Sequence, residues 1–174
     1  MRRMALPIEA YQIKELKAGD ELFLSGVVYT ARDAAHKRMA GLVKDGKALP
    51  ISLKKSAIYY TGPTPPPPGM AIGACGPTTS LRMDKFTPAL IKKGLRVMIG
   101  KGRRSREVRD AIRKYNALYL IAPAGCGALL AKSVVSAHLV AYNDLGPEAI
   151  YELKVKDFPV VVGIDACGRD IFSG

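Results

Sequence analysis

The chain has 174 residues, of which 48% are hydrophobic and 24% are charged, so its composition excludes an intrinsically disordered protein. The sequence contains no apolar run of the roughly 18–20 residues that a membrane-spanning helix needs. Lys and Arg outnumber Asp and Glu by 27 to 15, which gives a net charge of +12. This charge leaves three ligand classes open: nucleic acid, a small anionic substrate and an acidic partner protein.

The N-terminal segment and the cysteines indicate an intracellular protein. Residues 1–7 are basic but lack the apolar segment of a secretory signal, so we expect a soluble cytoplasmic protein. Cys75, Cys126 and Cys167 are about fifty residues apart and form no Cys-x-x-Cys pair. Because structural zinc sites need closely paired ligands, we expect reduced thiols and no metal site held by this chain.

The first half of the chain predicts strands flanking a helix. Residues 21–30 are rich in β-branched and aromatic side chains and predict a strand buried on both faces. Helical character follows over residues 32–43, and residues 48–53 predict a short strand. The run Pro65–Pro68, within residues 61–69, predicts a stiff connector inside one domain rather than a ligand for a signalling domain.

The second half alternates between strands and helices. A helix is expected from Thr87 as N-cap, with Pro88 in its first turn, to Gly94. Further strands are expected at 95–99, 117–122, 134–142 and 160–164, and further helices at 103–115 and 127–132. This alternation predicts parallel pairing with right-handed crossovers in a single α/β domain over residues 1–174. His138, within an apolar strand, is expected in the core.

Three loops that follow predicted strands each carry a cation. They are Arg32 after residue 30, Arg82 after residue 74 and Lys101 after residue 99. Ligands of α/β sheets bind beyond the carboxyl ends of the strands, so these cations are expected to converge on a small dianion such as a dicarboxylate. The other basic side chains, including Arg104 and Arg106, are expected to lie on the surface.

Each loop also has a simpler interpretation. The hydroxyls of Thr78, Thr79 and Ser80 suit an anion cradle or a cluster of helix N-caps. The Gly-Lys-Gly turn at Lys101 lacks the spacing of a phosphate-binding loop and also fits a solvated strand-to-helix turn. His36 suits a general acid or base, an orienting hydrogen-bond partner or a surface residue. With no close carboxylate pair or nucleophile elbow in the sequence, these loops predict half of an active site.

The same motifs resemble the class I fumarase β subunit. They are residues 30–38, 76–84 and 98–102, followed by residues 141–150 and 155–159. The resemblance extends from about Leu16 to near the C-terminus, and it includes the C-terminal domain of single-chain class I fumarases and the β subunit of L(+)-tartrate dehydratase. Ala31 and Leu81 stand where many relatives have glycine.

The resemblance implies a swivelling β/β/α three-layer domain with a mostly parallel sheet. It also implies reversible hydration of fumarate to L-malate in a complex whose α subunit ligates a [4Fe–4S] cluster. Carried over by motif, Arg32, Arg82 and Lys101 resemble the cations that bind the substrate carboxylates. Thr78 resembles the catalytic residue that moves a proton at the substrate carbon, and His36 and Thr79 are candidate supporting residues.

Two alternatives accompany this interpretation. L(+)-tartrate dehydratase uses the same β-subunit motifs, so the chain is also interpreted as a candidate tartrate dehydratase β subunit. A basic nucleic-acid-binding module is the alternative from a different class, and it predicts binding that weakens steeply with salt. These ordered motifs favour the hydro-lyase and a dicarboxylate substrate over nucleic acid.

Overall fold

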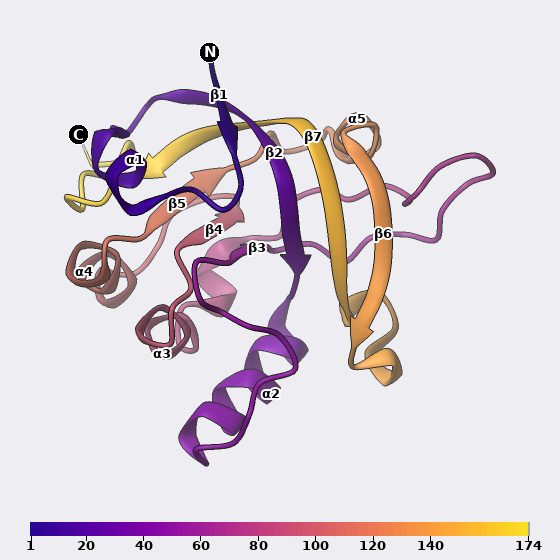
Figure 1. Cartoon of the computed structure of the whole chain (residues 1–174), viewed down its shortest axis with the longest axis horizontal. Coiled ribbons are helices and arrows are strands. Elements are labelled where there is room, and N and C mark those ends of the chain that lie inside the picture. The colour runs from indigo at the N-terminus through magenta and orange to yellow at the C-terminus, as the bar shows by residue number, and fades with distance from the viewer. Residues whose placement is uncertain (174) are drawn as a thin grey trace.

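A seven-stranded mixed sheet organises residues 1–173, the part of the chain that the computed structural model describes (Figure 1). The strand order is β1-β2-β3-β4-β5-β7-β6, with an additional pairing between β2 and β7. The strands are β1 (Arg2–Ala5), β2 (Glu21–Thr30), β3 (Ala57–Tyr59), β4 (Val97–Gly100), β5 (Leu118–Ile121), β6 (Val134–Ala141) and β7 (Ile150–Ile164).

The sheet has a parallel part and an antiparallel part. Strands β1 to β5 pair in parallel, whereas β7 runs antiparallel to β2, β5 and β6. Since β7 pairs with both β2 and β5, the strand pairings close into a ring. The parallel pairing expected for 134–142 and 160–164 is therefore wrong. Only the short 3-10 segment η2 (Asn143–Glu148) joins β6 to β7, and such a short connection favours an antiparallel hairpin.

Alternate side chains of the central strands face two separate cores. Tyr59 and Ile99 belong to a cluster shared with β2 and β7, whereas Ile58, Met98 and Tyr119 pack with residues of α2, α3 and α4. Burial on both faces explains the nearly continuous apolar sequence of these strands. The helices are α1 (Ala10–Glu15), α2 (Asp33–Lys44), α3 (Thr87–Lys92), α4 (Arg106–Tyr115) and α5 (Gly127–Ala131).

Most of the predicted elements are confirmed, with one clear error in the first half. The strand over residues 21–30 and the helices near 32–43, 103–115 and 127–132 are present. Residues 48–53 form no strand, and the strand lies instead at Ala57–Tyr59. The apolar side chains of Ile51 and Leu53 are nevertheless buried against the helical core. The apolar run therefore marked burial rather than strand pairing.

Two smaller expectations are also wrong. The N-cap of α3 is Phe86 rather than Thr87, whose hydroxyl donates to the Met83 carbonyl at 2.9 Å. His138 is exposed, because β6 pairs with β7 at the edge of the sheet. The Pro65–Pro68 run is exposed in the loop between β3 and the 3-10 turn η1 (Ser80–Met83), and this loop projects away from the sheet in Figure 1.

Within residues 1–173, every helix is too short or too polar to cross a membrane.

Candidate active site

The three cation-bearing loops leave the sheet side by side. In the parallel register, Thr30 of β2 pairs with Tyr59 of β3, and Tyr59 pairs with Ile99 of β4. The chain therefore continues in the same direction from three neighbouring strand ends. Arg32 lies two residues beyond Thr30, and Lys101 lies two residues beyond Ile99. The structure thus brings these loops to one edge of the sheet.

Thr78 and Lys101 lie on adjacent backbone segments. The Thr78 amide donates to the Tyr60 carbonyl at 2.7 Å, and the Lys101 amide donates to the Thr78 carbonyl at 3.3 Å. The Ser80 amide donates in turn to the Lys101 carbonyl at 2.9 Å. A side chain at Gly100 would prevent this approach, since its Cβ would lie 2.0 Å from the Ser80 Oγ. The glycine before Lys101 is therefore required by the close contact between the two loops.

Asp33 connects the two candidate arginines. The Arg82 Nε donates to the Asp33 Oδ1 at 3.0 Å, and its Nη2 lies 3.0 Å from Oδ2. The Arg32 Nε lies 3.9 Å from that same Oδ2 and 4.0 Å from the Glu148 Oε1. Sequence reasoning assigned no role to Asp33, although it lies within the 30–38 motif. Its carboxylate, at the start of α2, draws the Arg32 and Arg82 loops together.

The candidate groups remain partly accessible. The side chains of Arg32 and Arg82 are 26% and 53% exposed, and Thr78 and Lys101 are half-buried. Leu81 is also exposed. Two guanidinium groups and an ammonium group near threonine hydroxyls can bind a small molecule with two carboxylates through charge-assisted hydrogen bonds.

His36 is fully buried and orients the Arg32 loop. Its Nδ1 lies 2.8 Å from the Arg32 carbonyl, an acceptor, so Nδ1 carries the proton and donates. Burial lowers the pKa of His36 to about 4, and the nearby Arg104 charge acts in the same direction. Nε2 has no hydrogen-bond partner among the described residues, and the ring packs edge-on against Tyr60 at 5.1 Å between centroids. Of the three alternatives, this geometry supports the orienting partner and excludes a surface residue.

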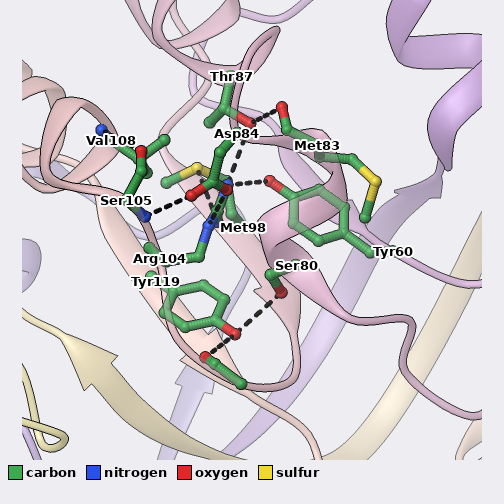
Figure 2. A network of polar contacts seen from close by, with 11 residues as sticks. Tyr60, Ser80, Met83, Asp84, Thr87, Met98, Arg104, Ser105, Val108 and Tyr119 are labelled. Atoms are coloured by element: carbon green, nitrogen blue, oxygen red, sulfur yellow. Dashed lines mark hydrogen bonds and ion pairs between the residues drawn. The ribbon is translucent and has the colours of Figure 1, made fainter.

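Arg104 is buried, so its expected surface position is wrong. Its side chain is 0% exposed and enters the polar network drawn in Figure 2. Nε donates to the Asp84 Oδ1 at 2.7 Å, and Nη2 donates to Thr87 Oγ1 at 3.0 Å and to the Tyr60 hydroxyl at 3.3 Å. Burial acts to lower the pKa of Arg104, but Tyr60 and Asp84 outweigh it and raise the pKa. Arg104 therefore stays charged inside the protein.

The network also includes two aromatic rings and a second set of hydrogen bonds. The guanidinium carbon of Arg104 lies 5.2 Å and 4.8 Å from the ring centroids of Tyr60 and Tyr119. The Tyr119 hydroxyl donates to the Gly102 carbonyl at 2.8 Å, so the Ser80 hydroxyl at 2.9 Å donates to Tyr119. Sequence spacing held no signal that distinguished Arg104 from its exposed neighbours.

The cysteines do not form a cluster site in this chain. Cys75 is buried, and burial raises its pKa to about 11, so its thiol stays protonated and packs against the loop at Gly127. Cys126 is half-buried and Cys167 is exposed. Across residues 1–173, no three His, Cys, Asp or Glu side chains gather closely enough to hold a metal ion. Because iron–sulfur clusters are held chiefly by grouped thiolates, the donors in this chain do not fit a [4Fe–4S] cluster.

A comparison with family models places the chain in a known family. A family model described as Fumarase C-terminus matches residues 2–174. The match covers nearly the whole sequence, and the chain therefore belongs to the Fumarase C-terminus family. This result confirms the resemblance identified from the loop motifs.

The chain is similar to three relatives with the following names. The chain is 38% identical over 164 residues to "Fumarate hydratase class I, aerobic" of Escherichia coli (strain K12), covering 93% of this chain and 30% of the relative. It is 37% identical over 164 residues to "Fumarate hydratase 2" of Leishmania major, covering 93% and 29%. It is 33% identical over 175 residues to "L(+)-tartrate dehydratase subunit beta" of Escherichia coli (strain K12), covering 98% and 86%. The chain thus spans about 30% of the length of these fumarate hydratases.

Proposed function

We propose that this chain is the β subunit of a heteromeric hydro-lyase that adds water reversibly to fumarate to give L-malate. The observation that carries the proposal is the meeting of three cation-bearing loops at one edge of the parallel strands. Membership of the Fumarase C-terminus family supports the same reaction class. The swivelling β/β/α three-layer arrangement belongs to this proposal, and the two cores on either side of the central strands support it.

Substrate binding is assigned to Arg32, Arg82 and Lys101. Fumarate and malate each carry two carboxylates, and guanidinium groups bind carboxylates through paired hydrogen bonds. In the structure, the Arg82 guanidinium already contacts a carboxylate, because its Nε donates to the Asp33 Oδ1 and its Nη2 lies 3.0 Å from Oδ2. A substrate carboxylate would approach the same cations, so Asp33 holds Arg82 in place while competing with the substrate for its donors.

Proton transfer is assigned to Thr78. During hydration, a water molecule supplies hydroxide to one substrate carbon and the Thr78 hydroxyl delivers a proton to the other. The proton that the water releases returns to the Thr78 oxygen, and dehydration reverses these transfers. A threonine hydroxyl is a weak base in water, so this role needs nearby cations and a site closed to solvent. The Tyr60 carbonyl and the Lys101 amide fix the backbone of Thr78 beside the backbone of Lys101. Thr79 is a supporting residue in the same turn.

The rest of the site is assigned to a partner α subunit. The charged groups of this edge are partly exposed, and the relative from the tartrate dehydratase is named as a subunit. The [4Fe–4S] cluster of the family resemblance is assigned to the α subunit, because the donors of this chain do not fit it. The chain alone is therefore expected to be inactive.

L(+)-tartrate is the second candidate substrate. This chain covers 86% of the length of the tartrate dehydratase β subunit, whereas it covers about 30% of the fumarate hydratases. Tartrate also carries two carboxylates and suits the same cations.

The proposal is tested by anaerobic assay of the chain alone and of its complex with the α subunit, using malate and L(+)-tartrate separately. We expect the complex, but not the isolated chain, to turn over substrate, and we expect malate to be preferred to L(+)-tartrate. Arg82→Met is expected to reduce turnover strongly, whereas Arg106→Met, which changes an 84% exposed side chain, serves as the matched control. Dehydration by the isolated chain would contradict the proposal that the α subunit completes the active site. Wild-type kinetics for Arg82→Met would show that Arg82 does not bind the substrate.

The nucleic-acid alternative has a separate test. If the charge of +12 serves nucleic acid, DNA or RNA binds the chain with an affinity that falls steeply with salt. The hydro-lyase proposal instead predicts no such binding at physiological salt. The measurement is a fluorescence titration of labelled DNA and RNA at several salt concentrations.

A further inference from the structure

Arg104 contacts two of the loops that form the candidate site. It lies three residues after Lys101, and its guanidinium reaches Asp84, which directly follows η1 and lies two residues from Arg82. The same group donates to the hydroxyl of Tyr60, the residue that follows β3. Figure 2 shows these side chains converging on the guanidinium from different segments. One buried side chain thus joins the loops after β3 and β4.

Tyr60 extends this connection to the other two candidate groups. Its carbonyl accepts the Thr78 amide at 2.7 Å, and its ring packs against His36. The His36 Nδ1 donates in turn to the Arg32 carbonyl at 2.8 Å. A displacement of Tyr60 would therefore move the backbone of both Thr78 and Arg32.

Asp84 fixes the far side of the Lys101 loop. Its Oδ1 accepts from the Arg104 Nε at 2.7 Å, and its Oδ2 accepts the Ser105 amide. Ser105 is the N-cap of α4, and its hydroxyl accepts the Val108 amide at 3.3 Å. The carboxylate thereby ties the end of η1 to the start of α4, with the Lys101 loop held between them.

A charged group in this position is not explained by stability alone. Buried ion pairs lose much hydration and are often matched or surpassed in stability by apolar residues of similar volume. The ion pair instead fixes the relative positions of three side chains, because the planar guanidinium donates to Asp84, Thr87 and Tyr60 together. A lysine keeps the charge but cannot reproduce that planar arrangement.

We propose that Arg104 is a positioning residue that sets the location of Thr78, Arg82 and Lys101 relative to one another. The inference rests on the proposed function, since these three residues are the assigned substrate-binding and proton-transfer groups. Arg104 does not touch the substrate. It acts through Tyr60 and Asp84, and its loss displaces groups that must lie within a fraction of an ångström of their working positions.

The kinetic test uses Arg104→Lys in the full chain, assembled with the α subunit. We expect kcat/KM for malate to fall by about tenfold to a hundredfold, with a raised KM and a lowered kcat, because binding cations and the proton-transfer residue are both displaced. Arg106→Lys makes the same chemical change at an exposed site and is expected to behave as wild type. Wild-type kcat and KM for a folded Arg104→Lys complex would overturn the proposal.

A second readout needs neither substrate nor α subunit. The amides of Thr78, Ser80 and Lys101 are hydrogen-bonded within the two loops, so their hydrogen exchange reports loop order directly. In the isolated chain, Arg104→Lys is expected to accelerate exchange at these amides and to leave the β6–β7 hairpin unchanged. Unchanged loop exchange, or equal acceleration throughout the molecule, contradicts a local positioning role.

The two readouts separate failure of this inference from failure of the proposed function. If the loops loosen but no wild-type complex turns over malate or tartrate, the positioning role stands and the proposed function fails. If Arg104→Lys does not fold, Thr87→Val provides the milder test, because it removes one acceptor of Arg104 at similar volume. That variant is expected to accelerate exchange at the same loop amides, and unchanged exchange overturns the proposal.

Discussion

Two arginine–aspartate pairs in this molecule have the same contact distance but different surroundings. The Arg104 Nε lies 2.7 Å from Asp84, and the Arg169 Nε also lies 2.7 Å from Asp165. In the first pair the side chains are 0% and 6% exposed, whereas Arg169 is 59% exposed and only Asp165 is fully buried. Contact distance therefore does not separate these pairs, but burial and the remaining partners do.

The remaining partners show what each pair organises. Asp165 accepts the amides of Ala18, Cys167 and Arg169, so its carboxylate caps a C-terminal turn with or without the guanidinium. Arg104, by contrast, donates to side chains from several segments and is enclosed by two aromatic rings. Arg104 therefore connects several segments at the candidate site, whereas Arg169 contacts a carboxylate that backbone amides already hold. Substitutions in the two pairs are expected to differ accordingly.

Asp84→Ala is expected to have the largest effect on stability. Removal of one partner leaves the Arg104 charge buried without its counterion, which lowers the free energy of unfolding by about 3–5 kcal/mol. It also leaves the Ser105 amide without its acceptor. Urea unfolding followed by circular dichroism measures the loss, since the sequence contains no Trp for fluorescence.

The matched control for Asp84→Ala is Asp110→Ala. Asp110 lies 3.9 Å from Arg106, and its side chain is 59% exposed. Exposed ion pairs contribute about 0–1 kcal/mol, so the control is expected to unfold nearly as the wild type does. Similar losses for the two variants would contradict the assigned difference between buried and exposed pairs.

The buried His36, which lies near Arg104, is expected to make the free energy of unfolding depend on pH. The unfolded chain protonates His36 near pH 6.5, whereas burial keeps it neutral in the folded chain down to about pH 4. The unfolded state therefore binds more protons in this range, and stability falls as the pH drops below 6.5. Between pH 7.5 and 5.0 the loss is about 2 kcal/mol. Urea unfolding at both pH values measures it.

Two variants identify His36 as the origin of that loss. In His36→Asn, the amide group retains a donor for the Arg32 carbonyl but cannot titrate, so the loss between pH 7.5 and 5.0 should shrink by about 2 kcal/mol. His138→Asn removes the exposed imidazole and is expected to retain the wild-type dependence. An unchanged dependence in His36→Asn would show that other groups cause it.

Asp165→Asn is expected to lower the free energy of unfolding by less than Asp84→Ala does and by less than the loss caused by His36 between pH 7.5 and 5.0. One side-chain oxygen remains as an acceptor, but the new amide group places a donor against amides or the guanidinium that also donate. The expected loss is about 1.5 kcal/mol at pH 7. Chemical unfolding of the variant measures it, and a loss above that of Asp84→Ala would reverse the order of the two pairs.

The sequence predicted where the candidate loops meet better than it predicted the contacts that hold them together. Strand spacing predicted that the Arg32 and Lys101 loops share one edge, because parallel strands share a direction and their loops start together. The strand expected to end at residue 74 is absent, and Arg82 lies in η1, after the long loop that follows β3, where it contacts Asp33. The pairing of β7 with β2, β5 and β6 was missed, since the apolar run at 160–164 carries no information about strand direction. The direction of β7 depends on which strands, distant in sequence, it pairs with.

Arg104 illustrates what a single sequence cannot reveal. Arg103, Arg104 and Arg106 follow the same glycine-rich turn, yet Arg104 alone among them is buried. Its burial depends on Asp84 and Thr87, which come from another loop and helix. Likewise, Asp33 gains its role from contact with Arg82, which is distant in sequence. The long-range contacts that define such residues leave no local pattern.

Arg169→Met is expected to have the smallest effect and tests the comparison most directly. The guanidinium is 59% exposed, and Asp165 keeps three backbone amides as donors after its removal. The free energy of unfolding should therefore fall by less than about 1 kcal/mol, whereas Arg104→Met should lower it several times more. Parallel urea titrations of the two variants measure this ratio. Equal losses would mean that the short ion-pair distance, rather than burial and connectivity, determines the contribution of each arginine.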